Sequence, residues 1–341
     1  MQSRTRVRTD TWRAGWGSSS NPDQVTTLVG PLGLRLAGSS ETEPGLRIGL
    51  AGLGRMGMPM ASRLAAANLL AGVYNRTPAS AEAFSAATGV KSFATPAELA
   101  DASNVIITMV ADEAASQSLF VGRDGFLDAL RPTSVVIEMA TVSLEHLRRI
   151  ASLVDPIDCS LIDAPVSGSV SMAHDGSLSI LVGGDAAVLE RVRPAFAIMG
   201  SRIFHLGALG AGSAMKLAVN TVVYALNQGI SEGLVLAERA GVQRHVAYEV
   251  FANSAIAAPF VHYRREQFEH PGDLEPALTL RLAAKDLRLI LRLAASVNLE
   301  LPQAEAGLEV LDEAVSAGFA EADVSAVAEL LRQSGENKAV K

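Results

Sequence analysis

The sequence predicts an α/β protein in which a doubly wound, mostly parallel sheet precedes an all-helical second domain. Short apolar runs alternate with helical patterns from about residue 46 to residue 204, which is the arrangement expected of βα units. Strand signals then become rare, and helical patterns dominate residues 213–333. The first of these patterns, at 213–240, is long. A chain of 341 residues has room for both domains.

The composition limits the classes of function. Hydrophobic residues make up 49% of the chain, enough for a sizeable core. A net charge of -7 argues against a nucleic-acid partner, because such proteins usually carry a basic face. No apolar run reaches the roughly 18–20 residues of a membrane span, so we expect no membrane partner. Cys159 is the only cysteine, which excludes an intramolecular disulfide and fits a protein of the reducing cytoplasm.

The first 44 residues differ from the rest of the chain. They are rich in arginine, serine, threonine and glycine and lack sustained periodicity, so we expect a disordered, dispensable extension. Their arginines could imitate a transit peptide. No clear amphipathic helix supports that alternative, and acidic residues appear at Asp10 and Asp23.

The expected elements follow in order. A buried strand at 46–52 leads into a helix at 56–70 and a second strand at 72–75. Helices at 96–102 and 144–153 separate later strands, which are expected at 104–108, 134–138, 160–163, 179–182 and 202–204. We place a Rossmann-type nucleotide-binding domain at 45–208 and the helical domain at 209–335. The helical patterns after residue 240 fall at 246–252, 280–297, 302–317 and 324–333.

A glycine-rich turn follows the first expected strand and has the form G-x-G-x-x-G. Here it directly precedes a helix, which is the context that dinucleotide binding requires. Gly52 permits the tight turn, Gly54 lets a pyrophosphate approach the backbone, and Gly57 permits close packing of the helix on the strand. The alternative is an ordinary glycine-rich turn without a ligand. The candidate cofactor residues of this turn are Gly52, Leu53, Gly54, Arg55, Met56 and Gly57.

The end of the second strand discriminates between the two nicotinamide cofactors. An NAD site usually has an acidic residue there, which binds the ribose 2′-hydroxyl. This chain has Asn75, Arg76 and Thr77 instead. Arg76 can pair with a 2′-phosphate, and Asn75 and Thr77 can donate hydrogen bonds to it. We therefore predict NADP(H) over NAD(H), with a solvated loop arginine as the alternative.

Two further segments carry candidate chemistry. Ser167 follows an expected strand, where open α/β sheets bind ligands, and its loop could hold a carboxylate. Lys216 lies in an apolar helical run, where burial would favour its neutral form, and Asn220 follows on the same helical face. An ordinary loop and a lysine that reaches solvent are the alternatives. The six histidines show no metal-ligand spacing, so no metal site is expected.

Together these segments resemble the β-hydroxyacid dehydrogenase superfamily, in particular its 3-hydroxyisobutyrate dehydrogenase and semialdehyde reductase branch. Four motifs occur in family order, at 52–57, 163–168, 210–220 and 285–287, and the resemblance covers about residues 46–333. It implies a helical C-terminal domain entered by a long interdomain helix. It also implies a homodimer or homotetramer assembled through that domain.

The resemblance also implies roles for individual residues. Lys216 matches the catalytic acid/base, and Asn220 matches a residue that orients the substrate. Ser167 and Gly168, followed by Ser169, match the loop that binds the substrate carboxylate. The positions that match cofactor-contacting residues are Met109, Val110, Thr141 and Lys285.

Several positions depart from the family pattern or leave their role open. Ser169 replaces a frequent glycine, Ala140 replaces a frequent serine, and Glu138 replaces the usual aspartate. The stretch 256–261 falls where relatives line the substrate pocket and is rather apolar, which would suit a bulkier substrate. Asp286 is a candidate for either catalysis or a structural hydrogen bond. Arg264 and Arg265 are expected on a solvated helix face, with a carboxylate-binding role as the alternative.

The sequence thus predicts an NADP(H)-dependent oxidoreductase of CH–OH groups that interconverts a small 3-hydroxyacid and its semialdehyde. The expected substrates resemble 3-hydroxyisobutyrate, 2-hydroxy-3-oxopropionate or succinic semialdehyde. An imine reductase on the same fold is the enzymatic alternative. A non-catalytic NADP-binding interaction protein is the alternative from another class. The presence of Lys216 favours carbonyl chemistry, because relatives of both alternative kinds usually lack that lysine.

Overall fold

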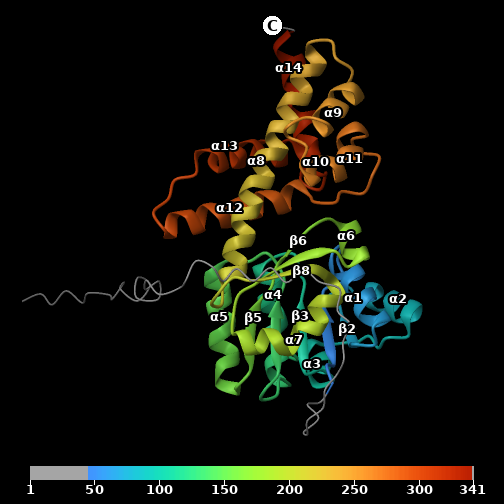
Figure 1. Cartoon of the computed structure of the whole chain (residues 1–341), viewed down its shortest axis with the longest axis vertical. Coiled ribbons are helices and arrows are strands. Elements are labelled where there is room, and N and C mark those ends of the chain that lie inside the picture. The colour runs from blue at the N-terminus through green and yellow to red at the C-terminus, as the bar shows by residue number, and fades with distance from the viewer. Residues whose placement is uncertain (1–44, 340–341) are drawn as a thin grey trace, which may run out of the picture.

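The computed structural model describes residues 45–339, and the side chains of residues 45–334. The expected disordered extension, residues 1–44, lies outside the described residues. Figure 1 shows a sheet-containing part, coloured blue to yellow-green, and a helical part, coloured gold to red, with one long helix running between them. None of the helices within 45–339 combines the length and apolar character that a membrane span needs.

A parallel sheet of five strands in the order β2-β1-β3-β4-β5 forms the centre of the first part, which confirms the expected fold class. Adjacent residues of a strand face opposite sides of this sheet, so Ile106 and Ile107 enter different hydrophobic cores. Burial on both faces explains why these strands are continuous apolar runs. The strands are β1 (Ile48–Ala51), β2 (Leu70–Tyr74), β3 (Val105–Thr108), β4 (Val135–Glu138) and β5 (Ser160–Asp163).

Short helices connect these strands and cover the sheet. Several begin at a side chain that accepts a backbone N–H: Thr95, Asp112 and Ser143 each cap a helix in this way. The helices are α1 (Gly57–Ala66), α2 (Pro78–Thr88), α3 (Pro96–Asp101), α4 (Glu113–Phe120) and α5 (Leu144–Val154), with 3₁₀ turns at Phe126–Asp128 and Asp155–Ile157.

The expected helix at 56–70 is too long by four residues. Helix α1 ends at Ala66, and Asn68 adopts a left-handed conformation with φ 57°. The N–H of Leu69 then bonds back to the carbonyl of Leu64, which closes the helix end. The chain enters β2 at Leu70, earlier than expected, because the apolar pattern of a helix end and that of a strand start are alike.

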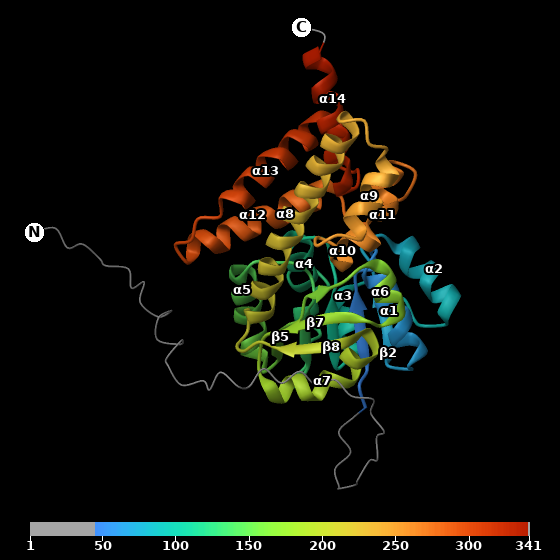
Figure 2. The same ribbon diagram turned by 45° about the horizontal axis from the view of Figure 1, so that its top comes forward.

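The later strands do not continue the large sheet, as one doubly wound sheet would require; an isolated antiparallel bridge between Asp163 and Gly183 connects the two. They form a separate sheet in the order β6-β7-β8, visible in front of the large sheet in Figure 2. Strand β6 runs antiparallel to β7 and has only two residues, too few to be recognised from periodicity. The elements of this part are β6 (Val166–Ser167), α6 (Val170–Asp175), β7 (Leu178–Val182), α7 (Ala186–Met199) and β8 (Gly200–His205).

The second part is entirely helical and is built around the 29-residue helix α8 (Ala211–Arg239). One core joins α8 to the C-terminal helices through Leu217, Leu287 and Leu311, and a second joins it to the shorter helices through Leu234 and Tyr248. The remaining helices are α9 (Arg244–Ala252), α10 (Pro259–Tyr263), α11 (Arg265–Glu269), α12 (Leu280–Ser296), α13 (Pro302–Ala314) and α14 (Val327–Ala339), with a π turn at Val315–Phe319 and a 3₁₀ turn at Val324–Ala326.

The carboxylate of Asp163 attaches α8 to the large sheet. Asp163 ends β5, and its two oxygens accept the backbone N–H groups of Gly210 at 2.7 Å and Ser213 at 2.6 Å. Both donors belong to the start of α8, where N–H groups have no partner within the helix. A Cβ at Gly212 would lie 2.2 Å from the carbonyl oxygen of Leu181, so the helix can start this close to β7 only with glycine there.

Removal of this carboxylate should loosen the start of α8. In Asp163→Ala two buried N–H groups lose their acceptor, and we expect a loss of about 3 kcal/mol in the free energy of unfolding. Asp163→Asn keeps one acceptor and should lose about half as much. Urea unfolding and hydrogen–deuterium exchange of residues 210–216 measure the two effects. Equal stability of the alanine variant and the wild type would show that α8 is held by packing alone.

Candidate active site

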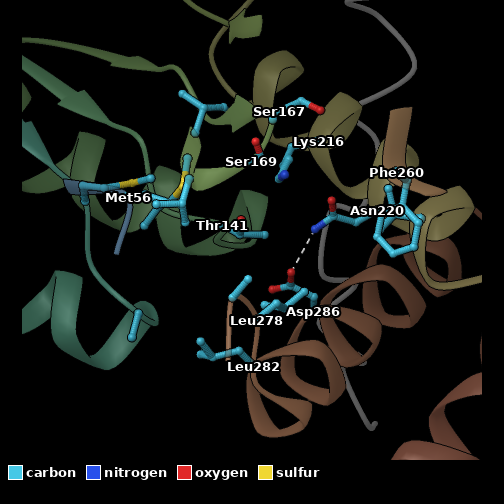
Figure 3. A pocket seen from close by; sticks show the side chains of 18 of the residues that line it. Met56, Thr141, Ser167, Ser169, Lys216, Asn220, Phe260, Leu278, Leu282 and Asp286 are labelled. Carbon is cyan, nitrogen blue, oxygen red and sulfur yellow. Dashed lines mark hydrogen bonds between the residues drawn. The ribbon is translucent and has the colours of Figure 1, made fainter. Parts of the chain in front are cut away.

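A cavity of about 460 Å³ lies where the sheet-containing part meets the helical part. Its walls come from loops at the carboxyl ends of β1, β3 and β4, from β6 and the turn after it, and from α8, α10, α11 and α12 (Figure 3). The carboxyl edge of a doubly wound sheet is where such folds bind ligands. The cavity brings together ten of the expected site residues, namely Met56, Met109, Val110, Thr141, Ser167, Gly168, Ser169, Lys216, Asn220 and Lys285.

The other expected residues lie along the β1–α1 turn and at the end of β2. Gly52 has φ 105°, and a Cβ there would lie 2.2 Å from the carbonyl oxygen of Met109. A Cβ at Gly57 would lie 1.9 Å from the carbonyl oxygen of Gly52. At Gly54, in contrast, a Cβ would meet no protein atom within 4 Å. The fold therefore requires Gly52 and Gly57, whereas Gly54 leaves open space beside the backbone, as the approach of a dinucleotide pyrophosphate needs.

Asn75 makes two hydrogen bonds within the chain. Its side-chain oxygen accepts the N–H of Leu53 at 3.0 Å, and its side-chain nitrogen donates to the carbonyl of Thr77 at 3.0 Å. The side chain thus ties the glycine-rich turn to the end of β2. Arg76 and Thr77 are exposed, and helix α2 begins directly after them at Pro78. The Arg76 guanidinium and the N-terminus of α2 both favour binding of an anion here.

Arg55 leaves the glycine-rich turn toward the helical part. Its guanidinium forms a 2.9 Å ion pair with Glu275, and both side chains are substantially exposed. Such a surface pair contributes little to stability. It does connect the turn expected to hold the cofactor with the segment that precedes α12.

Lys216 points into the cavity from the second turn of α8 and is partly buried. Burial lowers its pKa below the ordinary value, Asp286 opposes this shift, and Lys285 adds to it. Its helical neighbour Ala218 is exposed, so the desolvation comes from the cavity walls and not from the apolar run of the sequence. The amine is therefore closer to a change of protonation state than a surface lysine would be.

Asp286 is the hub of the hydrogen bonds around Lys216. One of its oxygens accepts the side-chain amide of Asn220 at 2.8 Å and the hydroxyl of Tyr224 at 2.7 Å, and the other pairs with Lys285 at 3.1 Å. Burial and the nearby Asp286 carboxylate raise the pKa of Tyr224 well above its ordinary value, so this phenol stays protonated. The donated N–H fixes the Asn220 amide and leaves its oxygen turned away from Asp286 (Figure 3).

Lys285 joins the two parts of the molecule. Its ammonium donates to the backbone carbonyls of Ala111 and Thr141, each at 3.0 Å. These carbonyls belong to the loops after β3 and β4, which also carry the expected cofactor contacts Val110 and Thr141. Lys285 is thus placed to hold those loops against α12.

The loop after β6, where we expected a substrate carboxylate to bind, forms part of the cavity wall. Ser167 and Gly168 line the cavity, and Gly168 has φ 150°. The hydroxyl of Ser169 accepts the N–H of Met172 at 3.2 Å and lies 2.7 Å from the Ser171 hydroxyl. Ser169 therefore caps α6, which gives this serine a structural role.

A buried polar cluster lies behind Ala140 and Thr141. Glu138 accepts the hydroxyl of Ser116 at 2.5 Å and the N–H of Ala140 at 3.0 Å, and His146 lies 2.9 Å from the same hydroxyl. Burial raises the pKa of Glu138 to about 7, although these hydrogen bonds oppose the shift. Burial also lowers the pKa of His146. Between the lowered pKa of His146 and pH 7, both side chains are therefore mostly uncharged. The cluster supports the loop after β4 through hydrogen bonds.

The part of the cavity wall that comes from the helical part contains residues that the sequence analysis missed or misplaced. Arg264 is 3% exposed and pairs with Asp323 at 2.6 Å, so its expected position on a solvated helix face is wrong. Of the apolar stretch 256–261, Phe260 lines the cavity whereas Ile256 is 45% exposed. No local pattern signals these positions, because segments far apart in the chain form the wall. Its members are Val223, Phe260, Tyr263, Arg264, Gln267, Leu278 and Leu282.

The fold and the cavity define a class of protein, the nicotinamide-dependent oxidoreductases that carry a helical second domain. Residues 47–207 match the family model described as the NAD binding domain of 6-phosphogluconate dehydrogenase. Residues 210–331 match the model described as NAD-binding of NADP-dependent 3-hydroxyisobutyrate dehydrogenase. The chain belongs to the β-hydroxyacid dehydrogenase superfamily.

Individual relatives agree with this family. The chain is 32% identical to glyoxylate/succinic semialdehyde reductase 1 of Arabidopsis thaliana, over 85% of this chain and 100% of the relative. It is 33% identical to 2-hydroxy-3-oxopropionate reductase of Escherichia coli strain K12, over 86% and 99%. The structure of 3-hydroxyisobutyrate dehydrogenase of Mycobacterium tuberculosis with L-serine superposes with a TM-score of 0.72 at 30% identity, covering 85% of this chain and 100% of that one.

The raised pKa of Glu138 gives a prediction about stability. Between the ordinary pKa of 4.5 and about 7, folded Glu138 keeps its proton while the unfolded chain loses it, so stability falls as the pH rises. Glu138→Gln should therefore become more stable than the wild type across this range. The gain should level off above pH 7 at on the order of 3 kcal/mol.

Denaturant unfolding of both proteins from pH 4 to pH 8 measures this difference. Glu82→Gln, at an exposed glutamate of α2, is the matched control and should show no such trend. A Glu138→Gln effect that does not change with pH would mean that the carboxyl is ionised throughout.

Proposed function

We propose that this protein is an NADP(H)-dependent oxidoreductase that interconverts a small 3-hydroxyacid and its semialdehyde, with Lys216 as the general acid and base. The observation that supports this proposal most directly is the position of Lys216. Its amine, with a lowered pKa, lines the same cavity as the loops expected beside the nicotinamide and the loop expected to bind a carboxylate. The names of the relatives, which include hydroxyacid dehydrogenases and semialdehyde reductases, support the same reaction class.

A bound nicotinamide would exchange hydride with the reacting carbon, and the chain would manage the proton. In reduction, the ammonium of Lys216 stabilises the negative charge that grows on the carbonyl oxygen and donates its proton to it. In oxidation, the neutral amine accepts the hydroxyl proton. A lowered pKa makes the neutral form accessible, so one residue can serve both directions.

The remaining side chains hold and orient the substrate. The backbone and hydroxyl of Ser167, with the N–H groups that follow it, would bind the substrate carboxylate before the start of α6. Asn220 would bind the substrate through the amide oxygen that Asp286 leaves free. Because Asp286 fixes the Asn220 amide, this contact needs no rearrangement when the substrate arrives.

The residues directly after β2 support a preference for NADP(H) over NAD(H). No acidic residue occurs at 75–77, Arg76 is exposed, and α2 points its N-terminus at the same place. The matching model of residues 210–331 is named for an NADP-dependent enzyme, which supports this choice. Residues 52–57, 109–110, 141 and 285 are proposed to contact the rest of the cofactor.

We also propose the assembly and location expected from the sequence. Large apolar side chains on α8 are exposed in the single chain, with Val222 at 68% and Leu236 at 72%, which supports a homodimer or homotetramer through the helical part. The free, buried thiol of Cys159 supports a cytoplasmic location.

Replacement of Lys216 should remove turnover but not cofactor binding. For Lys216→Ala we expect kcat/KM for a semialdehyde to fall about 10³-fold, because both charge stabilisation and proton transfer are lost. The dissociation constant for NADPH should change less than about threefold. In the wild type the reduction rate should fall, and the oxidation rate rise, as the pH passes through the lowered pKa of Lys216.

The assay panel should contain glyoxylate, succinic semialdehyde, 2-hydroxy-3-oxopropionate, methylmalonate semialdehyde and a cyclic imine. Lys91→Ala, at an exposed lysine outside the cavity, is the matched control. Near-normal turnover in Lys216→Ala would reject the acid/base role. Wild-type turnover of the imine alone would favour the imine reductase alternative.

Arg76 should decide the cofactor preference. Arg76→Asp replaces the proposed partner of the 2′-phosphate with a carboxylate that repels it and can bind a 2′-hydroxyl instead. The ratio of kcat/KM with NADPH to that with NADH should fall about 100-fold. Arg202→Asp, at an exposed arginine of β8, controls for the change in net charge. An unchanged ratio would refute the proposed phosphate contact.

A further inference from the structure

The loop after β4 is attached to the sheet through a side chain. The N–H of Met139 still bonds to the neighbouring strand, at the carbonyl of Thr108, with a length of 2.9 Å. The next N–H, that of Ala140, bonds instead to a carboxylate oxygen of Glu138 at 3.0 Å. Met139, Ala140 and Thr141 all line the cavity. Glu138 therefore holds the backbone at the point where the loop leaves the sheet and enters the cavity wall.

The helical part holds the same loop from the other side. Nζ of Lys285 in α12 donates to the carbonyl of Thr141 at 3.0 Å. Two contacts on adjacent residues thus define the loop, one at the N–H of Ala140 and one at the carbonyl of Thr141. Ala140 is only 2% exposed, so its N–H has few other partners within reach if the Glu138 carboxylate is removed.

Two neighbouring helices fix the carboxyl group of Glu138. Its other oxygen accepts the hydroxyl of Ser116 in α4 at 2.5 Å, and this hydroxyl lies 2.9 Å from Nε2 of His146 in α5. Glu138 and Ser116 are both 0% exposed, and His146 is 4% exposed. A buried side chain within a hydrogen-bonded network has little freedom to move. Glu138 therefore presents an acceptor of fixed position to Ala140.

A serine, a histidine and a carboxylate are also the groups of a hydrolytic triad, but their arrangement here is different. In such a triad the imidazole lies between the hydroxyl and the carboxylate. Here the hydroxyl of Ser116 lies between Glu138 and His146, and the cavity wall includes none of these three side chains. The geometry therefore fits a positioning role and not a nucleophilic one.

The bond to Ala140 does not depend on the charge of Glu138. Burial raises the pKa of Glu138 to about 7, so both forms occur near neutral pH. The ionised form accepts hydrogen bonds from Ala140 and from Ser116, whose oxygen can accept the Nε2–H of His146. The protonated form donates to Ser116, whose hydroxyl can then donate to His146, and it still accepts the N–H of Ala140. The cluster thus holds the loop in either state.

We propose that Glu138 is a positioning residue that sets where the loop 139–141 meets the nicotinamide end of the cofactor. Ser116 and His146 fix its carboxyl group, and it acts through the backbone of Ala140. A displacement of about 1 Å in an active site can lower a rate roughly 100-fold, so the position of this loop matters for hydride transfer. The proposal rests on the proposed function for the place of the nicotinamide.

Two neutral variants of similar size separate the hydrogen bond from the charge. Glu138→Gln can repeat the pattern of the protonated glutamate, because its amide oxygen accepts the N–H of Ala140 while its amide nitrogen donates to Ser116. Glu138→Met has no such acceptor, so the N–H of Ala140 loses its partner and the loop shifts to find another. We therefore expect the methionine variant to displace the loop and the glutamine variant to keep it in place.

The experiment measures how much the nicotinamide contributes to binding. 2′-Phospho-ADP-ribose lacks only the nicotinamide of NADPH, so the ratio of its dissociation constant to that of NADPH isolates this contribution. In the wild type we expect a ratio of at least about ten. Glu138→Met should lower the ratio about fivefold and kcat/KM for a semialdehyde about 30-fold. Glu138→Gln should keep both within about threefold of the wild type. A general loss of stability would weaken both ligands equally and leave the ratio unchanged.

A second variant tests the proposal if Glu138→Met does not fold. Ser116→Ala removes the hydroxyl that fixes Glu138 but leaves the acceptor for Ala140, so the ratio should fall about two- to threefold. The matched controls are Ser118→Ala, at an exposed serine of α4, and Glu145→Met, at an exposed glutamate of α5. Both controls should keep the wild-type ratio.

The outcomes separate the positioning role from the proposed function. An unchanged ratio in Glu138→Met, or in Ser116→Ala if only that variant folds, overturns the positioning role, while NADPH-dependent turnover in the wild type upholds the proposed function. An equal fall in Glu138→Gln and Glu138→Met also overturns it, because the charge and not the hydrogen bond would then matter. A wild-type ratio near one overturns it as well. If the wild type neither binds NADPH nor reduces a semialdehyde, the proposed function fails and the positioning role fails with it.

Discussion

The buried carboxylate of Asp163 links the large sheet to the helix that carries Lys216. It ends β5, it begins the segment that carries Ser167, and it accepts two N–H groups at the start of α8. Lys216 lies one helical turn beyond Ser213, so its distance from the Ser167 loop is set through this one side chain. Burial raises the pKa of Asp163, and the hydrogen bonds from α8 oppose that shift. The helix start and the carboxylate therefore stabilise each other.

Charge balance is the second constraint on the site. Lys216 and Lys285 are brought close together, and Asp286 compensates both, with further hydrogen bonds from Asn220 and Tyr224. Three donors surround this buried carboxylate, and each replaces a water molecule that burial removes. Proton exchange at Lys216 then alters the charge of the site by one unit without leaving any neighbouring group unpaired.

Local sequence signals predicted the parts of the protein that depend on neighbours in the chain. The glycine-rich turn, the central strands and the long helix that carries Lys216 all follow from spacing of a few residues. The two-residue β6, the helix end at Asn68 and the tether formed by Asn75 depend on backbone geometry that side-chain patterns do not encode. Arg264 was misplaced because its partner, Asp323, is 59 residues away in the chain. The hydrogen bonds of Asp286 likewise could not be predicted from the sequence, because they join α12 to α8.

Arg264 and Gln267 belong to a stretch of short helices, α10 and α11, that contains none of the groups assigned to proton transfer. The segment from Pro259 to Leu278 packs on α9, on the later turns of α8 and on the turn that contains Ser325. Lys216 lies in the second turn of α8, beside the sheet and α12. The part of the cavity wall that this segment supplies can therefore change its shape while the first turns of α8 stay attached to the sheet through Asp163.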